Sequence, residues 1–297
     1  MSSSDMHAFP EIITKHIRIR KLDIVYYQCG SADRVVVLAH GAGADSALLS
    51  WQEVLPLLAA RGYTVVAPDL PGYGKSDRLP AGEAYSLPFY SAFIRDFVKA
   101  LDLEKPVLGG LSLGGGITIK AALDEPELLS AIIPVDAWGL SNRLPWHRLT
   151  HWYTRSALNR WIYPYSARSR WMIRWSLEAN LFGDKSKVTE ALVDEVQKAM
   201  QTPDAGEPFR SFQEAEITPT GLTTSLYDYL HHIDLPVLLV HGSNDSAVPL
   251  RDAKQALPRF KHAELYVMEG CKHWPQKERP EEFVEAVDSF LKNKEGI

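Results

Sequence analysis

Cysteine is scarce in this chain of 297 residues, and long apolar runs and a large excess of charge are missing. Its two cysteines, Cys29 and Cys271, are typical of a protein of the reducing cytoplasm. No run of about 18 apolar residues occurs, so we expect no membrane span. Residues 1–5 lack the basic and apolar regions of a signal peptide. The net charge of −5 argues against a nucleic-acid partner. We therefore expect a cytoplasmic protein.

Metal-ligand spacing is missing as well. His231 and His232 are adjacent, so their side chains project in different directions. Cys271 lies close to His273, but a single cysteine beside a histidine is usually a packing residue. We expect no metal and no cofactor. The 45% of hydrophobic and 23% of charged residues describe an ordinary globular chain, long enough for one large core.

The most informative segment is Leu-Gly-Gly-Leu-Ser-Leu-Gly-Gly-Gly at 108–116. Gly110, Ser112 and Gly114 fit the G-x-S-x-G pattern, in which a serine stands on a sharp turn between a strand and a helix. Glycine is needed on both sides because side chains there would collide across the turn. An apolar run precedes the motif and a helix-compatible segment follows it. The pattern predicts that Ser112 is a nucleophile.

A serine hydroxyl needs a base, and the base needs a carboxylate that orients it. Asp245 follows the apolar run 236–240, and His273 follows the strand candidate 263–268. Both residues come after Ser112, in the order acid then base. Asp136, after the run 131–135, is a rival acid that we rank below Asp245. Ligands bind at the carboxyl ends of parallel strands, where all of these residues are expected.

An acyl-transfer site also needs hydrogen-bond donors for the oxyanion. The backbone N–H after the nucleophile, that of Leu113, is one candidate. The small-residue loop after the strand 35–39 supplies the other, and we favour the N–H of Ala42, with Gly43 as the alternative. His40 in this loop is expected to shape the loop and not to act as a base.

Strand and helix patterns alternate along most of the chain. This indicates an α/β fold with a doubly wound, mostly parallel sheet. We expect opening strands at 17–20 and 23–27, a strand at 64–67, and helices at 48–60, 88–101 and 280–292. The alternation stops between Trp138 and about Leu230. We expect a core of residues 1–138 and 231–297, and a helical cap of residues 139–230.

The first part of this insertion combines tryptophan with arginine. Five tryptophans lie between Trp146 and Trp175, and residues 139–180 hold seven arginines, no lysine and one acid. Such a segment can bind single-stranded nucleic acid, hold a substrate carboxylate, or pack the cap while its arginines face solvent or pair with acids. We favour the packing interpretation, with some tryptophans lining an apolar pocket above Ser112.

The chain resembles the α/β-hydrolase superfamily. The resemblance is carried by five segments: His40-Gly41, Asp69 to Asp77, Gly110 to Gly114, His241-Gly242 with Asp245, and Gly270 with His273. It implies an α/β-hydrolase fold with Ser112 as nucleophile, His273 as base and Asp245 as orienting acid. Dehalogenases and epoxide hydrolases of the superfamily use an aspartate nucleophile, so serine at 112 argues against those activities.

We therefore predict a serine hydrolase that cleaves a carboxylic ester or lactone through an acyl-enzyme on Ser112. The expected substrate is a small molecule with an apolar or aromatic acyl group, bound near Trp138, Trp146 and Trp274. A first alternative is a carbon–carbon bond hydrolase of aromatic degradation, which looks similar around 273–276. Such enzymes often carry asparagine where this chain has Leu111. A second alternative is a receptor that binds a ligand without turnover.

Overall fold

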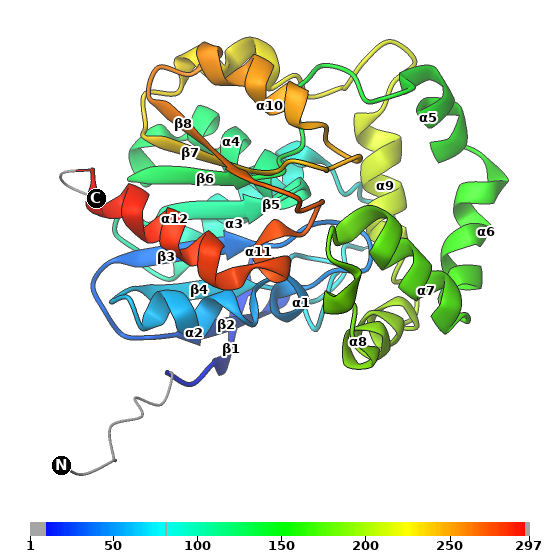
Figure 1. Cartoon of the computed structure of the whole chain (residues 1–297), viewed down its shortest axis with the longest axis horizontal. Helices are drawn as coiled ribbons and strands as arrows, with labels where there is room; N and C mark the ends of the chain where they lie inside the picture. The colour runs from blue at the N-terminus through cyan, green and yellow to red at the C-terminus, as the bar shows by residue number, and fades with distance from the viewer. Residues whose placement is uncertain (1–9, 81, 295–297) are drawn as a thin grey trace.

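Eight strands form a mixed sheet in the order β1-β2-β4-β3-β5-β6-β7-β8 (Figure 1). The computed structural model describes residues 10–80 and 82–294, so residues 1–5, used above to judge a signal peptide, lie outside the described residues. The strands are β1 (Ile13–Ile19), β2 (Leu22–Cys29), β3 (Val35–Ala39), β4 (Thr64–Pro68), β5 (Val107–Leu111), β6 (Ala131–Val135), β7 (Val237–Gly242) and β8 (Ala263–Met268). β1 and β2 are antiparallel, and β3 to β8 run parallel to one another. The predicted fold class is confirmed.

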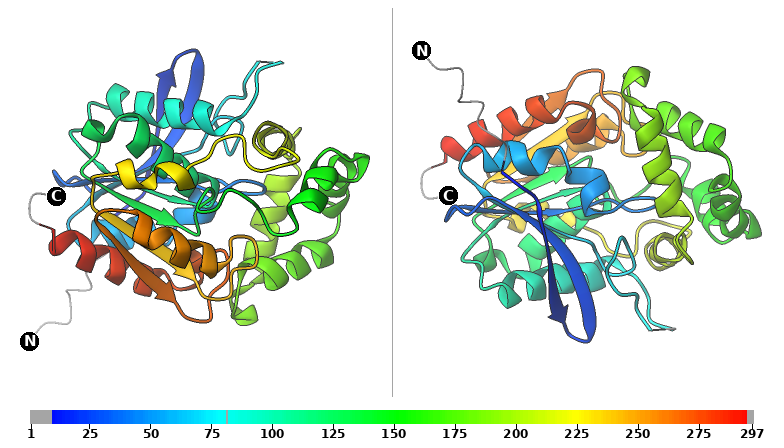
Figure 2. Two further views of the ribbon diagram at one scale, coloured as in Figure 1. Left: turned by 90° about the horizontal axis from the view of Figure 1, so that it is seen from above. Right: turned by 90° about the horizontal axis from the view of Figure 1, so that it is seen from below.

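Helices cover both faces of this sheet (Figures 1 and 2). The helices of the core are α1 (Ala47–Trp51), α2 (Val54–Ala59), α3 (Leu87–Ala100), α4 (Leu113–Asp124), α10 (Leu250–Ala256), α11 (Pro275–Glu278) and α12 (Pro280–Lys292). Side chains of α1, α2 and α12 pack with Val36 and Leu38 of β3 on one face. Those of α3, α4 and α10 pack with Val37 on the other face. Such double burial explains why the central strands are continuous apolar runs.

One expected helix is divided in the structure. The prediction at 48–60 corresponds to α1 and α2, with a turn at Gln52 and Glu53 between them. Pro56 in the second piece has no N–H to donate to the carbonyl of Gln52, so a continuous helix would lack that bond. The two opening strands are longer than expected, because their antiparallel pairing extends to Ile13 and Gln28, and Cys29 pairs with Val65 of β4.

The segment between β6 and β7 is mainly helical. It contains α5 (His147–Thr154), α6 (Ala157–Ser166), α7 (Arg170–Ser176), α8 (Glu190–Met200) and α9 (Glu207–Glu216), which we call the cap helices. Within the described residues, its strand-like pairing is limited to one bridge between Ile217 and Leu222. Figure 1 shows the cap helices together at one end of the sheet. The domain boundaries at 138/139 and 230/231 stay a prediction.

Short helical turns complete the chain. They are η1 (Pro126–Leu128), η2 (Leu177–Leu181), η3 (Lys185–Lys187), η4 (Tyr227–His232) and η5 (Leu257–Arg259). η2 is a π-helical turn that follows α7 directly, and η3 leads into α8.

Candidate active site

Ser112 lies at the junction between β5 and α4, with φ 53° and ψ −110°. A residue other than glycine in this region is strained by roughly 1–3 kcal/mol, so neighbouring contacts must hold it. The Ser112 N–H donates to the carbonyl of Val135 at 2.8 Å. The Ser112 carbonyl accepts from the N–H groups of Gly116 at 3.0 Å and Trp138 at 2.9 Å. These bonds fix the turn on which the nucleophile candidate stands.

The flanking glycines are required by close backbone contact. A Cβ atom on Gly110 would lie 2.3 Å from the backbone of Gly114. A Cβ atom on Gly114 would lie 2.2 Å from the carbonyl oxygen of Ala39 in β3. Both distances are far below any real Cβ contact. The motif spacing therefore follows from the packing of α4 against β3 and β5.

Asp245 and His273 are joined by a hydrogen bond of 2.6 Å between Oδ2 and Nδ1. Both side chains are buried. The other carboxylate oxygen of Asp245 accepts the N–H groups of Ala247 at 2.7 Å and Val248 at 3.1 Å. Burial works to raise the pKa of Asp245, but the charge and hydrogen bond of His273 and the Val248 N–H outweigh it, so this pKa is lowered. An ionised Asp245 holds the His273 proton on Nδ1 and leaves Nε2 available as a base.

Asp136 is a second carboxyl close to this pair. It is fully buried, and its Oδ1 accepts the Gly242 N–H at 3.0 Å. Burial and the negative charge of Asp245 raise its pKa well above the usual range. Asp136 is thus held neutral beside an ionised Asp245, as two close carboxyls require. In the structure the carboxylate bonded to His273 is that of Asp245.

His241 completes a buried cluster with the two carboxyls. Ligand atoms of Asp136, His241 and Asp245 all lie within 4.8 Å of one another, which is close enough for a metal. However, the ring Nε2 of His241 is 2.8 Å from the carbonyl of Val248 and donates to it. Burial lowers the pKa of His241, so the ring is neutral. His241 Nε2 is occupied by the Val248 carbonyl and Asp245 is already bonded to His273, so the cluster is held together without a cation. The absence of a metal stays a prediction.

The loop after β3 approaches Ser112 from the other side. A Cβ on Gly41 would lie 3.6 Å from the Cβ of Ser112. The Gly41 N–H donates to Asp45 at 2.8 Å, so it is not free for an oxyanion. His40 is buried, with Nδ1 bonded to the carbonyl of Gly41 at 2.7 Å and Nε2 accepting the Leu70 N–H at 3.0 Å. His40 shapes the loop, as expected. The oxyanion donors Ala42 and Leu113 stay a prediction.

Ser112 and His273 line one cavity of about 440 Å³ beneath the cap helices. Ala42 and Trp274 also line it, as do Tyr153, Ile162 and Trp175 of the cap helices. Most of the wall is apolar, and lysine and arginine are absent from its described lining. The sequence did not single out Ile162, Met172 or Phe209 of this wall. The sequence shows that these three residues are apolar and lie in the cap segment. It does not show which side of each helix faces the core.

Two of the three predicted pocket tryptophans do not line this cavity. The ring of Trp138 packs edge to face on Phe212 of α9 with centroids 5.2 Å apart, and only its backbone supports Ser112. Trp146 precedes α5 and its side chain is exposed. The expectation that the tryptophans pack the cap was also wrong, since all five between 146 and 175 are exposed. Trp175 is the one of these five that lines the cavity.

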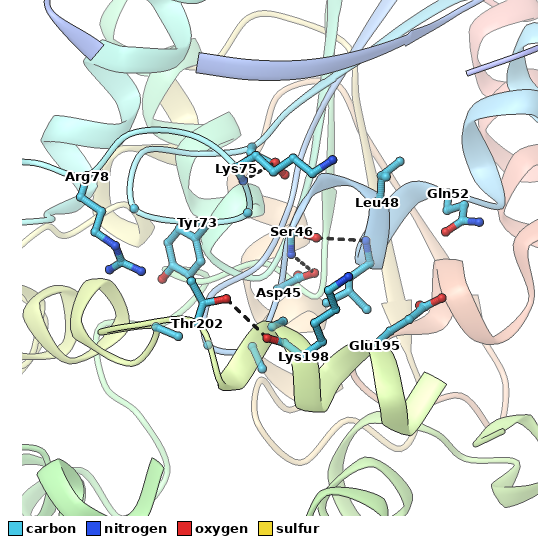
Figure 3. A pocket seen from close by; sticks show the side chains of 18 of the residues that line it. Asp45, Ser46, Leu48, Gln52, Tyr73, Lys75, Arg78, Glu195, Lys198 and Thr202 are labelled. Atoms are coloured by element: carbon cyan, nitrogen blue, oxygen red, sulfur yellow. Dashed lines mark hydrogen bonds between the residues drawn. The ribbon is translucent and has the colours of Figure 1, made fainter. Parts of the chain in front are cut away.

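A second hollow of about 380 Å³ adjoins the first (Figure 3). It shares Gly43, Ala44 and Tyr163 with the Ser112 cavity. Lys75 and Arg78 reach it from the loop after β4, and Lys198 reaches it from α8. Asp45, Asp69 and Glu195 line the same hollow, so Tyr163 borders both the apolar cavity that contains Ser112 and a hollow with charged side chains of both signs.

The comparisons with known proteins agree with this geometry. A profile of the alpha/beta hydrolase fold family matches residues 34–280. The chain belongs to this family. It is 29% identical over 265 residues to 2-hydroxy-6-oxo-2,4-heptadienoate hydrolase of Pseudomonas putida, with 88% of this chain and 90% of that protein covered. It is 27% identical over 277 residues to 2-hydroxy-6-oxo-6-(2'-aminophenyl)hexa-2,4-dienoic acid hydrolase of Metapseudomonas resinovorans, with 92% and 88% covered.

Solved structures show the same similarity. The meta-cleavage product hydrolase of Pseudomonas fluorescens IP01 superposes with a TM-score of 0.79 at 26% identity, over 94% of this chain and 97% of that one. A thermophilic esterase of Thermogutta terrifontis gives a TM-score of 0.76 at 18% identity, over 94% and 98%, and shows the fold alone. The protein is thus a hydrolase of this fold.

The remaining sequence expectations concern membranes and thiols. Within the described residues, no helix has the length and apolarity to span a bilayer. Cys29 and Cys271 are free and buried. Burial raises the pKa of Cys271 to about 12, so this thiol stays neutral and cannot compete with Ser112 as a nucleophile.

Proposed function

We propose that the protein is a serine hydrolase that cleaves a carboxylic ester or lactone with an apolar or aromatic acyl group. The observation that carries this proposal is the cavity, which joins Ser112 and His273 to a mostly apolar wall without lysine or arginine in its described lining. An acyl chain gains free energy by leaving water for such a wall. A substrate carboxylate would find no cation there.

The proposed reaction uses three side chains, of which His273 and Asp245 are hydrogen-bonded and Ser112 lines the same cavity as His273. Ser112 Oγ attacks the carbonyl carbon, and His273 Nε2 takes the hydroxyl proton. The N–H groups of Leu113 and Ala42 are the proposed oxyanion donors, each worth roughly 3–4 kcal/mol in comparable sites. His273 then gives the proton to the leaving alcohol oxygen. Water attacks the acyl-enzyme and releases the carboxylic acid, and the proton that His273 accepts from it returns to Ser112.

A carbon–carbon bond hydrolase is a second candidate. The two curated relatives above are hydrolases of 2-hydroxy-6-oxo-dienoates by name. Trp274, which follows the base candidate, also lies in the cavity. Two features count against this candidate. Leu111 precedes the nucleophile in place of asparagine. The described cavity lining holds no lysine or arginine for the acid group of a dienoate, and such side chains line the adjoining hollow instead.

The test compares kcat/KM for p-nitrophenyl acetate, hexanoate and phenylacetate with that for a 2-hydroxy-6-oxo-dienoate. We expect hexanoate and phenylacetate to exceed acetate, and the dienoate to be turned over slowly. Ser112→Ala should lower ester turnover to near background, and a fluorophosphonate should label Ser112 in the wild type. A preference for the dienoate would favour the second candidate. Absence of both turnover and labelling would favour a binding protein, and we propose a cytoplasmic location in each case.

A further inference from the structure

Five tryptophans of the cap segment, in or next to its first three helices, are exposed. Trp146, Trp152, Trp161, Trp171 and Trp175 are between 58% and 84% exposed, and we call this set the aromatic face. It extends over α5, α6 and α7, which form the outer rim of the cap on the side away from the sheet (Figures 1 and 2). Large apolar side chains that are exposed together mark a surface that another molecule covers.

In helix α6, the exposed apolar side chains lie along one side of the helix. Leu158, Trp161, Ile162 and Tyr165 recur at the spacing i, i+3, i+4 and i+7, which puts them on one stripe of the helix. Such a stripe ordinarily faces a protein core. Here its four members are between 37% and 69% exposed. α6 is therefore an amphipathic helix whose apolar side stays largely exposed, and within the described residues only Ile162 of this stripe lines the Ser112 cavity.

The charge of the surrounding surface is strongly positive. Residues 139–177 contain seven arginines and no lysine, aspartate or glutamate, in a chain whose net charge is −5. Arg170 and Arg174 pair with Glu190 of α8. No described carboxylate forms an ion pair with the other five, which are Arg143, Arg148, Arg155, Arg160 and Arg168. These five residues are exposed. The apolar stripe is thus bordered by uncompensated positive charge.

We propose that the aromatic face and its arginines dock the protein on an anionic lipid bilayer, with α5, α6 and α7 lying at the membrane surface. Tryptophan and tyrosine prefer the headgroup region, and arginine is attracted to anionic lipids there. Helices with one apolar aromatic side and an arginine-rich polar side lie in the plane of a bilayer interface. A symmetric contact with a second copy would bring two arginine-rich surfaces together, so charge disfavours that occupant.

The docked face continues into the cavity. Ile162 and Trp175 belong to the exposed surface and also line the cavity that holds Ser112. We therefore expect an apolar molecule that leaves the bilayer to reach the cavity along these two shared side chains. This consequence rests on the proposed function, whereas docking itself does not depend on catalysis.

The experiment measures binding of the full chain to sedimenting vesicles, made of phosphatidylcholine alone or with one quarter phosphatidylserine. Wild type and Ser112→Ala should bind the anionic vesicles equally well, and added salt should weaken binding. The double variant Trp161→Ser/Trp171→Ser should bind at least about tenfold more weakly. Arg148→Gln/Arg168→Gln should bind the anionic vesicles about fivefold more weakly for each arginine removed.

Matched controls use exposed residues of the same kind elsewhere in the chain. Ile13→Ser/Tyr229→Ser removes two exposed apolar side chains, and Arg18→Gln/Arg251→Gln removes two exposed arginines, all outside the cap helices. The controls should bind like wild type. Melting curves check the fold, and Trp161→Ser alone replaces any double variant that unfolds.

Three results would overturn the proposal. They are no binding to anionic vesicles, equal binding to vesicles of phosphatidylcholine alone, and the same loss in the controls as in the cap variants. A dimer in light scattering that the tryptophan variants abolish, together with no vesicle binding, would assign the face to a second copy. Because the readout is binding, an inactive but membrane-bound protein would contradict the proposed function and leave the docking intact.

Discussion

At the scale of single residues, the two neighbouring carboxyls differ in protonation. Asp245 is bonded to His273 and has a lowered pKa, because the charge and hydrogen bonds of its partners outweigh its burial. Asp136 is fully buried beside that negative charge and has a raised pKa. Only the ionised carboxylate can stabilise a histidine that becomes positively charged during the reaction.

This difference in protonation predicts that replacing each aspartate by asparagine affects kcat very differently. Asp245→Asn should lower kcat by about 10⁴, because the amide favours the wrong tautomer of His273. Asp136→Asn replaces one neutral side chain by another and keeps an oxygen for the Gly242 N–H, so kcat should change by less than about tenfold. Ester turnover of the two variants is the measurement. The reverse ranking would identify Asp136 as the orienting acid.

At the scale of elements, the nucleophile turn depends on how closely α4 meets the sheet. Gly114→Ala would force a Cβ into the Ala39 carbonyl, and this clash involves backbone that cannot rotate away. We expect the variant to lose more than about 3 kcal/mol of stability, or to keep its fold with a displaced Ser112 and little activity.

The matched control is Gly62→Ala. Gly62 has φ 91°, but nothing lies within 4 Å of its Cβ position. This variant should lose about 1–2 kcal/mol from backbone strain alone and keep its activity. Thermal unfolding and ester turnover measure both effects. Equal losses of stability and activity in the two variants would show that backbone strain alone, and not close packing, explains why glycine is needed at position 114.

At the scale of the whole molecule, Asp288 ties α12 to the turn between α2 and β4. Its carboxylate accepts from Arg61 at 2.9 Å, Tyr63 at 3.0 Å and Lys292 at 2.8 Å. Burial works to raise its pKa, but the hydrogen bonds from Lys292, Arg61 and Tyr63 outweigh burial and lower it. A carboxylate with a lowered pKa stabilises the folded state above its unfolded pKa of about 3.9.

We therefore expect Asp288→Asn to lower the free energy of unfolding by about 1–3 kcal/mol at neutral pH. The gap to wild type should close as the pH falls below about 4 and through the lowered folded pKa, because wild type then loses the same charge. Asp234→Asn, which breaks an exposed pair with Lys261, should change the free energy by less than about 0.5 kcal/mol. Denaturant unfolding at several pH values measures both. A gap of Asp288→Asn that is independent of pH would contradict an ionic role for this residue.

The sequence by itself determined the sheet and the end of the sheet where chemistry is expected. Ser112, Asp245 and His273 each follow an apolar run, and the carboxyl ends of parallel strands meet at one edge. Local patterns are sufficient there, because a nucleophile turn needs glycine at fixed positions and a buried strand needs consecutive apolar residues.

Only the tertiary structure decided which cap residues meet the nucleophile. Ile162, Met172 and Trp175 line the cavity, whereas Trp138 packs on Phe212 and Trp146 faces solvent. The spacing of Leu158, Trp161, Ile162 and Tyr165 is that of a core-facing helix, yet this stripe is exposed. Periodicity gives the apolar side of a helix but not its partner. The partner is set by how α5, α6 and α7 dock on elements far away in the sequence.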